Sequence, residues 1–164
     1  MADLCCTYTY AGLTLNPAQV GEEPAAGLYL DEEDGVTGLD GAPIRSQIDP
    51  KGQTDGGIVH TKRFAHRIIV FKGFFLTSED TRDVRLTEEY RDELLDLQDA
   101  ARSALEGQLN SESSLAWTPA NDGGGRSISC TYGIEGGEWK VGGTMVDPTW
   151  TFTLVADDPN ISGD

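Results

Sequence analysis

The feature of the sequence that most constrains its fold is an apolar run at the end of the segment from position 41 to position 76. Between positions 68 and 76 the chain reads IIVFKGFFL, in which β-branched and aromatic side chains dominate. The run is too short for a membrane span and has the composition of a β-strand. A strand in a one-sided sheet alternates apolar and polar residues, so a run without alternation predicts a strand buried on both faces. One cover would be the domain's own helix, and the other would be more protein, such as another subunit.

The same segment is the basic part of an acidic chain. The 164 residues have a formal net charge of −16, yet positions 51 to 76 carry five basic side chains against the single acid Asp55. A cationic segment on an anionic molecule lets one copy meet an acidic surface of the next, and such head-to-tail contacts can close into a ring. The alternative is a basic strand that acids of its own chain neutralise. On the first interpretation, the candidate subunit interface comprises Lys62, Arg63, Arg67, Ile69, Phe71 and Lys72.

Length and composition favour a single β-rich domain with a proper core. The chain is 38% hydrophobic, and its 20 glycines and seven prolines separate short β-rich runs, which indicates many turns. The sequence contains no stretch with the character of a membrane span or of a secretory signal, so we expect assembly in the cytosol. The three cysteines are odd in number and two of them are adjacent, which argues against a disulfide framework.

Periodicity predicts strands, then one long helix, then strands. Residues 11–26 are expected to be a loop or an extended arm that reaches toward a neighbour. Thr87 can cap a helix whose apolar residues recur every three or four positions, at Tyr90, Leu94, Leu97, Ala101, Leu105 and Leu109. The predicted strands cover residues 4–10, 27–30, 44–49, 58–64, 67–76, 115–118, 127–134 and 149–156. This order is typical of an α+β, β-dominated fold whose helix lies on a sheet sandwich or barrel.

No pattern of catalytic residues or metal ligands stands out. The sequence lacks the zinc-protease, phosphate-loop, serine-hydrolase and paired-cysteine motifs. The acidic turn at 31–34 does not have the spacing of a calcium-binding EF-hand loop, so a solvated turn is favoured. The net charge argues against binding of DNA through its phosphates, although an acidic channel would let DNA slide without sticking. We therefore expect no enzyme, no cofactor and no metal.

Several short motifs follow one another in a characteristic order. They are GLYLD at 27–31, GAPIR at 41–45, DGG at 55–57, RIIVFKG at 67–73, a helix with alanines at 100 and 101, LAWTP at 115–119 and LVADDP at 154–159. By this order and spacing, the chain resembles the N-terminal domain of distal tail proteins of siphovirus-type, long-tailed bacteriophages. The resemblance covers residues 27–159. It leaves 1–26 as an N-terminal strand and arm and 160–164 as a C-terminal tail.

The resemblance implies a β-sandwich or split barrel related to the phage tail-tube fold, with one long α-helix. It also implies a structural protein of the virion, assembled in the host cytoplasm, that forms a homo-hexameric ring at the tail tip, or baseplate. Such a ring would join the tail tube to the tip hub and fibres. It would surround the path of the tape-measure protein and of DNA, which passes without specific binding.

Two other functions are compatible with the sequence. A tail-tube or tail-completion subunit would also form rings. A carbohydrate-binding β-sandwich would need an exposed tryptophan on which a sugar can stack. Trp150 alternates with Phe152 and Leu154 and is expected in the core, so Trp139, in a glycine-rich connection, is the better candidate.

Overall fold

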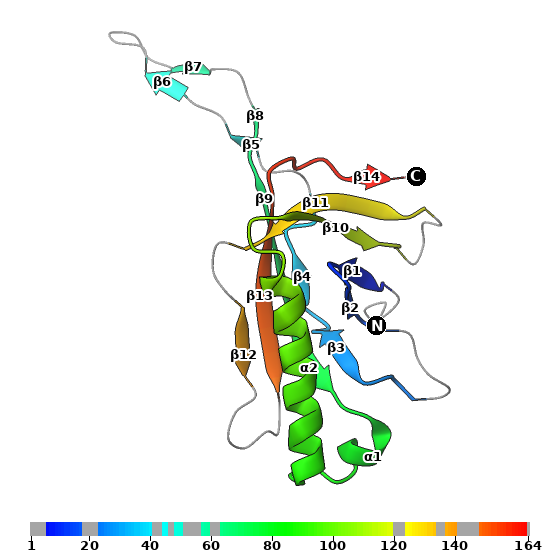
Figure 1. Ribbon diagram of the computed structural model, residues 1–164. Coiled ribbons are helices and arrows are strands. Elements are labelled where there is room, and N and C mark those ends of the chain that lie inside the picture. Colours follow the sequence, from blue (N-terminus) through cyan, green and yellow to red (C-terminus); the bar gives the residue numbers. More distant parts are fainter. Residues whose placement is uncertain are drawn as a thin grey trace.

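The structure is a computed structural model, and it describes most of the chain. The described residues are 6–17, 23–40, 44–45, 48–50, 57–59, 63–119, 124–133, 137–140 and 148–163. Figure 1 shows the elements that these residues form. They are β1 (Tyr8–Tyr10), β2 (Leu13–Leu15), β3 (Gly27–Leu30), β4 (Val36–Thr37), β5 (Ile44–Arg45), β6 (Ile48–Pro50), β7 (Gly57–Val59), β8 (Arg63–Phe64), β9 (Arg67–Leu76), α1 (Glu79–Arg82), α2 (Glu88–Glu106), β10 (Glu112–Trp117), β11 (Arg126–Tyr132), β12 (Glu138–Lys140), β13 (Thr149–Ala156) and β14 (Ser162–Gly163).

Seven strands close into a barrel-like sheet. Their order is β13-β11-β10-β1-β2-β3-β9, and β9 pairs with β13 to complete the ring. The closing pair is antiparallel and runs from Arg67 opposite Ala156 to Phe74 opposite Thr149. Strands β4, β12 and β14 extend this sheet by pairing with β9, β13 and β11. The predicted β-dominated α+β fold with one long helix is confirmed.

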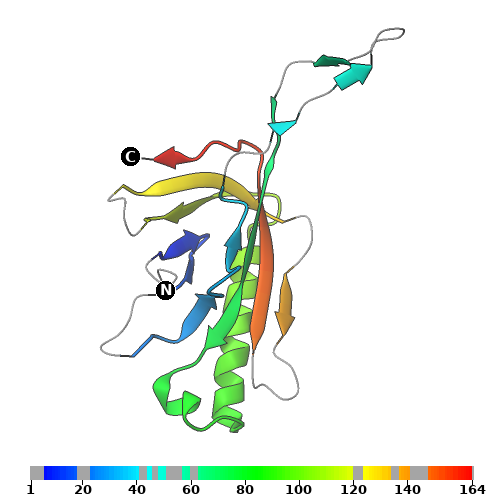
Figure 2. The same cartoon turned by 180° about the vertical axis from the view of Figure 1, so that it is seen from behind.

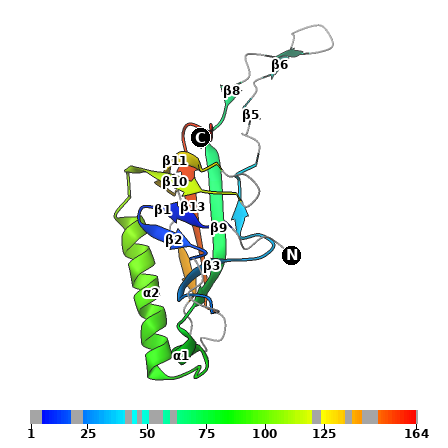
Figure 3. The ribbon, with the colours of Figure 1, turned by 90° about the vertical axis from the view of Figure 1, so that its right-hand side faces the viewer.

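Helix α2 lies along the barrel next to β2 and β9 (Figure 3). It begins as predicted at Thr87, whose hydroxyl accepts a hydrogen bond from the Tyr90 amide at 3.2 Å. The predicted apolar stripe faces the barrel, with Tyr90, Leu94, Ala101 and Leu105 buried. Leu109 departs from the prediction, because it lies beyond the end of the helix and is 54% exposed.

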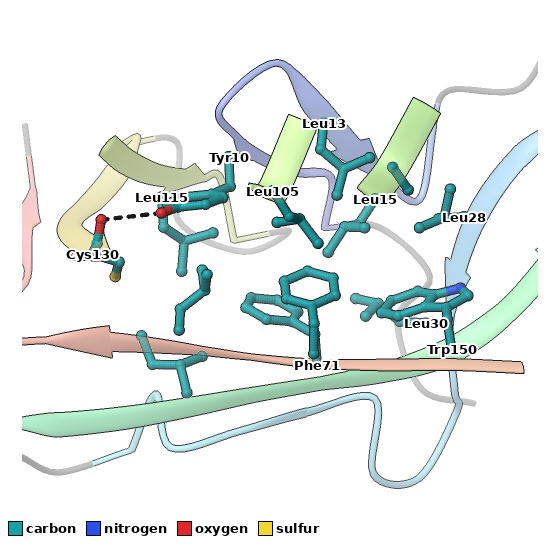
Figure 4. Packing of buried hydrophobic residues seen from close by; sticks show 14 of the residues in the cluster. Tyr10, Leu13, Leu15, Leu28, Leu30, Phe71, Leu105, Leu115, Cys130 and Trp150 are labelled. Carbon is teal, nitrogen blue, oxygen red and sulfur yellow. Dashed lines mark hydrogen bonds between the residues drawn. The ribbon is translucent and has the colours of Figure 1, made fainter. Parts of the chain in front are cut away.

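The core fills the space inside the barrel and under α2 (Figure 4). The ring of Phe71 stacks on that of Phe152 with centroids 5.2 Å apart, and Trp150 stacks on Phe152 at 5.5 Å. Trp150 also donates a hydrogen bond from Nε1 to the Phe74 carbonyl at 2.9 Å, so its expected place in the core is confirmed. Tyr10 crosses the core and donates from its hydroxyl to the Cys130 carbonyl at 3.2 Å.

Residues 11–17 differ from the predicted loop or extended arm, because they include a strand. Ala11 and Gly12 have positive φ angles of 52° and 84° and reverse the chain, so that β2 returns alongside β1. The Asn16 side chain then accepts a hydrogen bond from the Leu30 amide at 2.9 Å and donates one to the Cys6 carbonyl at 3.2 Å. These contacts place both strands within the barrel. Residues 18–22, and the first residues of the predicted strand 4–10, lie outside the described ranges.

Two short two-stranded ribbons project beyond one end of the barrel (Figures 1 and 2). In one ribbon β5 pairs with β8, and in the other β6 pairs with β7. They overlap the strands predicted at 44–49 and 58–64, although Pro50 of β6 and Gly57 of β7 lie just outside those ranges. Because the ribbons lead into the start of β9, Arg63 of β8 and Arg67 belong to this end of the molecule.

Candidate subunit interface

Strand β9 carries the apolar run, and its two faces have different surroundings. Along the strand, buried and more exposed residues alternate from Arg67 to Leu76. The inward side chains, from Ile69 to Phe75, lie in the core. On the outward side Ile68 is 45% exposed and Phe74 is 37% exposed. The single chain therefore covers the inward face only, and the predicted cover of the other face by more protein stays a prediction.

Strand β13 continues this outward surface. It pairs with β9 so that Val155 lies opposite Ile68 and Thr149 lies opposite Phe74. Its outward residues are half-buried except Thr149, which is exposed. We call the outward residues of the two strands the outer face: Ile68, Val70, Lys72, Phe74, Thr149, Thr151, Thr153 and Val155. Figure 2 views the molecule from the side on which these strands lie in front of α2.

The outer face has little charge compared with the rest of the chain. Lys72 is its single charged residue, and it contains no carboxylate, although the sequence has 28 acidic residues. The exposed acidic turn at 31–34 lies at its border, where the Asp31 amide donates to the Lys72 carbonyl at 3.0 Å. A β-surface of valine, isoleucine, threonine and phenylalanine is suited to packing against another protein surface.

The backbone around Gly73 fixes how β3 and β13 flank the outer face. A Cβ atom at Gly73 would lie 1.9 Å from the Tyr29 carbonyl oxygen and 2.6 Å from Trp150 Cζ2. Only glycine allows this close approach. Next to Gly73, the ring of Phe74 stacks on that of Tyr29, with centroids 6.0 Å apart.

Arg67 is buried and hydrogen-bonded at the start of β9. Its Nε and Nη2 donate to the Pro159 carbonyl at 3.2 and 2.9 Å. Its Nη1 donates to the carbonyls of Gly38, at 3.0 Å, and Asp40. The side chain is 4% exposed, so it joins three segments of its own chain.

The structure distributes the six residues of the sequence-based interface over different environments. Ile69 and Phe71 are fully buried in the barrel, and Arg67 is buried as described. Lys72 is exposed on the outer face. Arg63 belongs to β8 and its side chain is not described, and Lys62 lies outside the described residues. The role of these residues in an interface stays a prediction, to which the structure adds the exposed Ile68 and Phe74.

The other candidate sites receive less support from the geometry. Trp139, the predicted sugar platform, is half-buried, and its ring lies 6.1 Å from that of Phe75 and 6.5 Å from that of Phe152. Within the described ranges, no group of three or more histidine, cysteine, aspartate or glutamate side chains is placed to hold a metal ion. Neither described helix has the length and apolar character needed to cross a bilayer.

The comparisons with known proteins agree with this architecture. No protein-family profile and no curated protein sequence matches the chain. Among solved structures, it matches the Dit protein (gp 19.1) of phage SPP1, described as a paradigm of the hub adsorption apparatus in phages that infect Gram-positive bacteria. The TM-score is 0.58 at 16% sequence identity, over 97% of this chain and 52% of that one. This chain has the fold of a phage distal tail protein.

The Dit-like fold confirms, at the level of the fold, the resemblance that the order of sequence motifs predicted. At 16% identity, few residues carry this likeness, and the arrangement of barrel, helix and strand order carries it instead. The chain spans about half the length of the Dit protein it matches.

Proposed function

We propose that this chain is a structural protein of a phage tail, and that its copies assemble into a ring, most simply a hexamer, at the tail tip. The observation that carries the proposal is the match of nearly the whole chain to the fold of Dit, a protein of a phage adsorption hub. In this role the ring joins the tail tube to the tip hub and surrounds the path of the tape-measure protein and DNA. The chain then acts as a scaffold and performs no catalysis.

The outer face is the surface through which we propose that neighbouring copies meet. Two molecules with a net charge of −16 repel each other wherever carboxylates face carboxylates. The outer face itself has no carboxylate, and Glu138 at its edge, opposite Thr151, is paired with Lys140 at 3.2 Å, so this repulsion is reduced there. The exposed Ile68 and Phe74 also gain from leaving water. Lys72, together with Lys62 and Arg63 of the sequence-based interface, can then pair with acids of the next copy.

The acidic surface elsewhere suits the channel of such a ring. On α2 the exposed side chains include Asp92, Asp96, Asp99 and Glu106. A wall of carboxylates repels the phosphates of DNA and so lets it pass without binding. The proposal therefore assigns DNA as a passing molecule and the neighbouring tail proteins as the binding partners.

Imaging of the purified protein tests the proposal. Negative-stain electron microscopy and mass photometry should show single rings of one symmetry, alone or with the tail-tube protein of the same phage. Long stacks of rings would instead favour a tail-tube subunit. A monomer under all these conditions, with no partner that assembles it, would overturn the proposal.

A matched pair of variants tests the surface. Ile68→Asp places a carboxylate on the outer face and should abolish rings while the chain stays folded. Leu95→Asp makes the same change on α2, at a side chain that is 40% exposed compared with 45% for Ile68, and should leave rings intact. Equal ring formation by both variants would show that the outer face is not part of the interface between copies.

A further inference from the structure

The α1–α2 loop, residues 83–87, exposes two apolar side chains at the end of the barrel away from the ribbons (Figure 1). Val84 is 54% exposed and Leu86 is 73% exposed, the largest value among the exposed large hydrophobic residues that the structure describes. By comparison, Ile68 and Phe74 of the outer face are 45% and 37% exposed. Burial of Val84 and Leu86 against another molecule would be favourable, because apolar surface gains from leaving water.

Leu86 has a backbone conformation that a leucine rarely adopts. Its φ angle is 78°, in the left-handed region that favours glycine and asparagine. Leu86 precedes the capping residue Thr87, and an apolar side chain at this position can pack on the fourth residue of the helix. Here the fourth residue is the exposed Arg91, and Leu86 itself is mostly in water. A leucine at this position is therefore unfavourable for the backbone and makes no such packing contact, a combination that occurs where a residue serves a function.

Hydrogen bonds hold the α1–α2 loop in place relative to α2. Glu93 of α2 accepts hydrogen bonds from the Ser78 amide at 2.8 Å, from the Ser78 hydroxyl at 3.0 Å and from the Thr81 hydroxyl, so it ties α1 to α2. At the loop itself, the Val84 amide donates to the Thr81 carbonyl at 3.3 Å, and the Thr87 amide donates to the Val84 carbonyl at 3.4 Å. The loop is therefore held in one arrangement before it meets a partner, which lowers the entropic cost of binding.

The chain around the α1–α2 loop is acidic. Residues 79–93 carry seven acidic side chains against three arginines, a net charge of −4. Two segments outside the described ranges, 18–22 and 141–147, adjoin residues that contact this end of the molecule. Glu23 lies 3.4 Å from Arg82, and the Pro148 carbonyl accepts a hydrogen bond from the Phe75 amide at 3.0 Å. Both segments contain one acidic residue and no lysine or arginine, so neither can neutralise the charge of residues 79–93.

The exposed apolar side chains and the negative charge together indicate the chemistry of the partner. Contact of the loop with the same loop of a second copy would place a net charge of −4 against another of −4, which is unfavourable. A suitable surface has an apolar hollow that receives Leu86 and lysine or arginine side chains around it. We propose that the α1–α2 loop docks into such a surface on a neighbouring tail protein that is not a copy of this chain. This inference rests on the proposed tail function and adds the surface by which the ring contacts its neighbour.

The experiment measures binding of the full chain to the purified tail-tube and hub proteins of the same phage by biolayer interferometry. Leu86→Asn keeps a residue suited to a positive φ angle but removes the apolar side chain. It should weaken binding to one of the two probes by about tenfold or more, while the melting temperature and the rings stay unchanged. Leu109→Asn is the matched control, because it removes a leucine that is 54% exposed beyond the other end of α2, and it should leave binding unchanged.

A second pair of variants tests the charge of the partner surface. Asp83→Lys reverses an exposed charge in the α1–α2 loop and should weaken the same complex about tenfold. Asp96→Lys makes the same change at an exposed position in the middle of α2 and should leave the complex unchanged. An equal loss in both variants would show attraction by net charge alone and would refute docking through the loop.

The other results separate this proposal from the proposed function. Rings of the wild type that bind neither probe, or equal binding by wild type and Leu86→Asn, would overturn the docking site and leave the ring standing. Loss of rings in Leu86→Asn would assign the loop to the contact between copies, and a lower melting temperature would assign Leu86 to the stability of its own chain. Either result would also overturn the docking site. A wild type without rings, alone and with both probes, would overturn the proposed function itself.

Discussion

The two faces of the β9–β13 pair are built from the same strands in the same register, yet they serve different ends. On the inner face Phe71, Phe152 and Trp150 are at most 1% exposed and stack on one another. On the outer face threonines alternate with exposed or half-buried aliphatic and aromatic side chains. The inner face is complete within one chain, whereas the outer face leaves Ile68 and Phe74 in water. The difference indicates that folding of the monomer depends on the inner face. The composition of the outer face is instead suited to contact with another molecule.

The largest expected effect on stability comes from truncating one aromatic ring, and it should differ between the two faces. Phe71→Ala removes a fully buried ring and should lower the free energy of unfolding by about 3–5 kcal/mol. Phe74→Ala, on the adjacent surface of the same strand, should cost much less because its ring already contacts water. Urea unfolding followed by tryptophan fluorescence measures both. Similar losses in the two variants would break the distinction between the faces.

The second effect tests whether the buried Arg67, at the start of β9, contributes to the stability of the monomer as the inner face does. Arg67→Met keeps the length of the side chain but leaves the carbonyls of Gly38 and Pro159 without their donor, so we expect a loss of about 2–3 kcal/mol in the free energy of unfolding. Lys72→Met, at an outward position of the same strand, is the matched control and should change stability little. Thermal unfolding by circular dichroism checks the pair. A neutral Arg67→Met would show that the three segments it joins are held by other contacts.

A third and smaller effect concerns the polar contacts that follow β9. Burial acts to raise the pKa of Glu93, but hydrogen bonds from Thr81 and from the amide and hydroxyl of Ser78, together with the charge of Arg82, outweigh it and hold the pKa below its usual value. Glu93→Gln should therefore cost about 0.5–1 kcal/mol at neutral pH, a modest value because solvent screens this site.

The pH dependence of this variant has a definite sign. A lowered pKa in the folded state means that the contribution of Glu93 is fully present above the ordinary pKa of a glutamate. It is lost as the pH falls through the lowered pKa. The difference in unfolding free energy between wild type and Glu93→Gln, measured in urea from neutral to acidic pH, should shrink in that window. A constant difference would show that the ionised carboxylate is not what holds Ser78 and Thr81.

A fourth effect on stability, as small as that of Glu93→Gln, is expected from the outer face itself. The double variant Ile68→Ser, Val155→Ser changes a cross-strand pair that faces outward, and it should lower the free energy of unfolding by only about 1 kcal/mol. Its effect on assembly should be far larger, which analytical ultracentrifugation can measure beside the melting temperature. A strongly destabilised monomer would mean that the outer face contributes to the fold of the single chain.

Elements with a clear local period were predictable from the sequence. Thr87 and the spacing from Tyr90 to Leu105 located α2, and the alternation of Trp150, Phe152 and Leu154 located β13 and its buried side. Short elements were missed. Helix α1 has four residues and no buried side chain, and β2 has three residues, so neither has a periodic pattern to detect.

The candidate interface was the least predictable feature, because β9 is apolar on both sides. Ile69 and Phe71 differ little in character from Ile68 and Phe74, so the sequence contains no signal for which pair points inward. The alternation of residues within β13 identifies its inner side chains, and the register between β13 and β9 would then identify those of β9. This step requires knowledge that the two strands pair. The two strands are about 80 positions apart in the sequence, and only the tertiary structure shows that they pair.

The sequence by itself determined the class of the fold, the position of α2 and the acidic character of the chain, since each depends on local periodicity or on composition. The tertiary structure alone decided the closure of the barrel by β9 and β13, the burial of Arg67 and the outward position of Ile68. It also brought Ser78 and Thr81 to the carboxylate of Glu93. The physical reason is that these features arise from contacts between distant segments, whose pairing depends on how all the apolar surfaces pack together and not on the preferences of any one stretch.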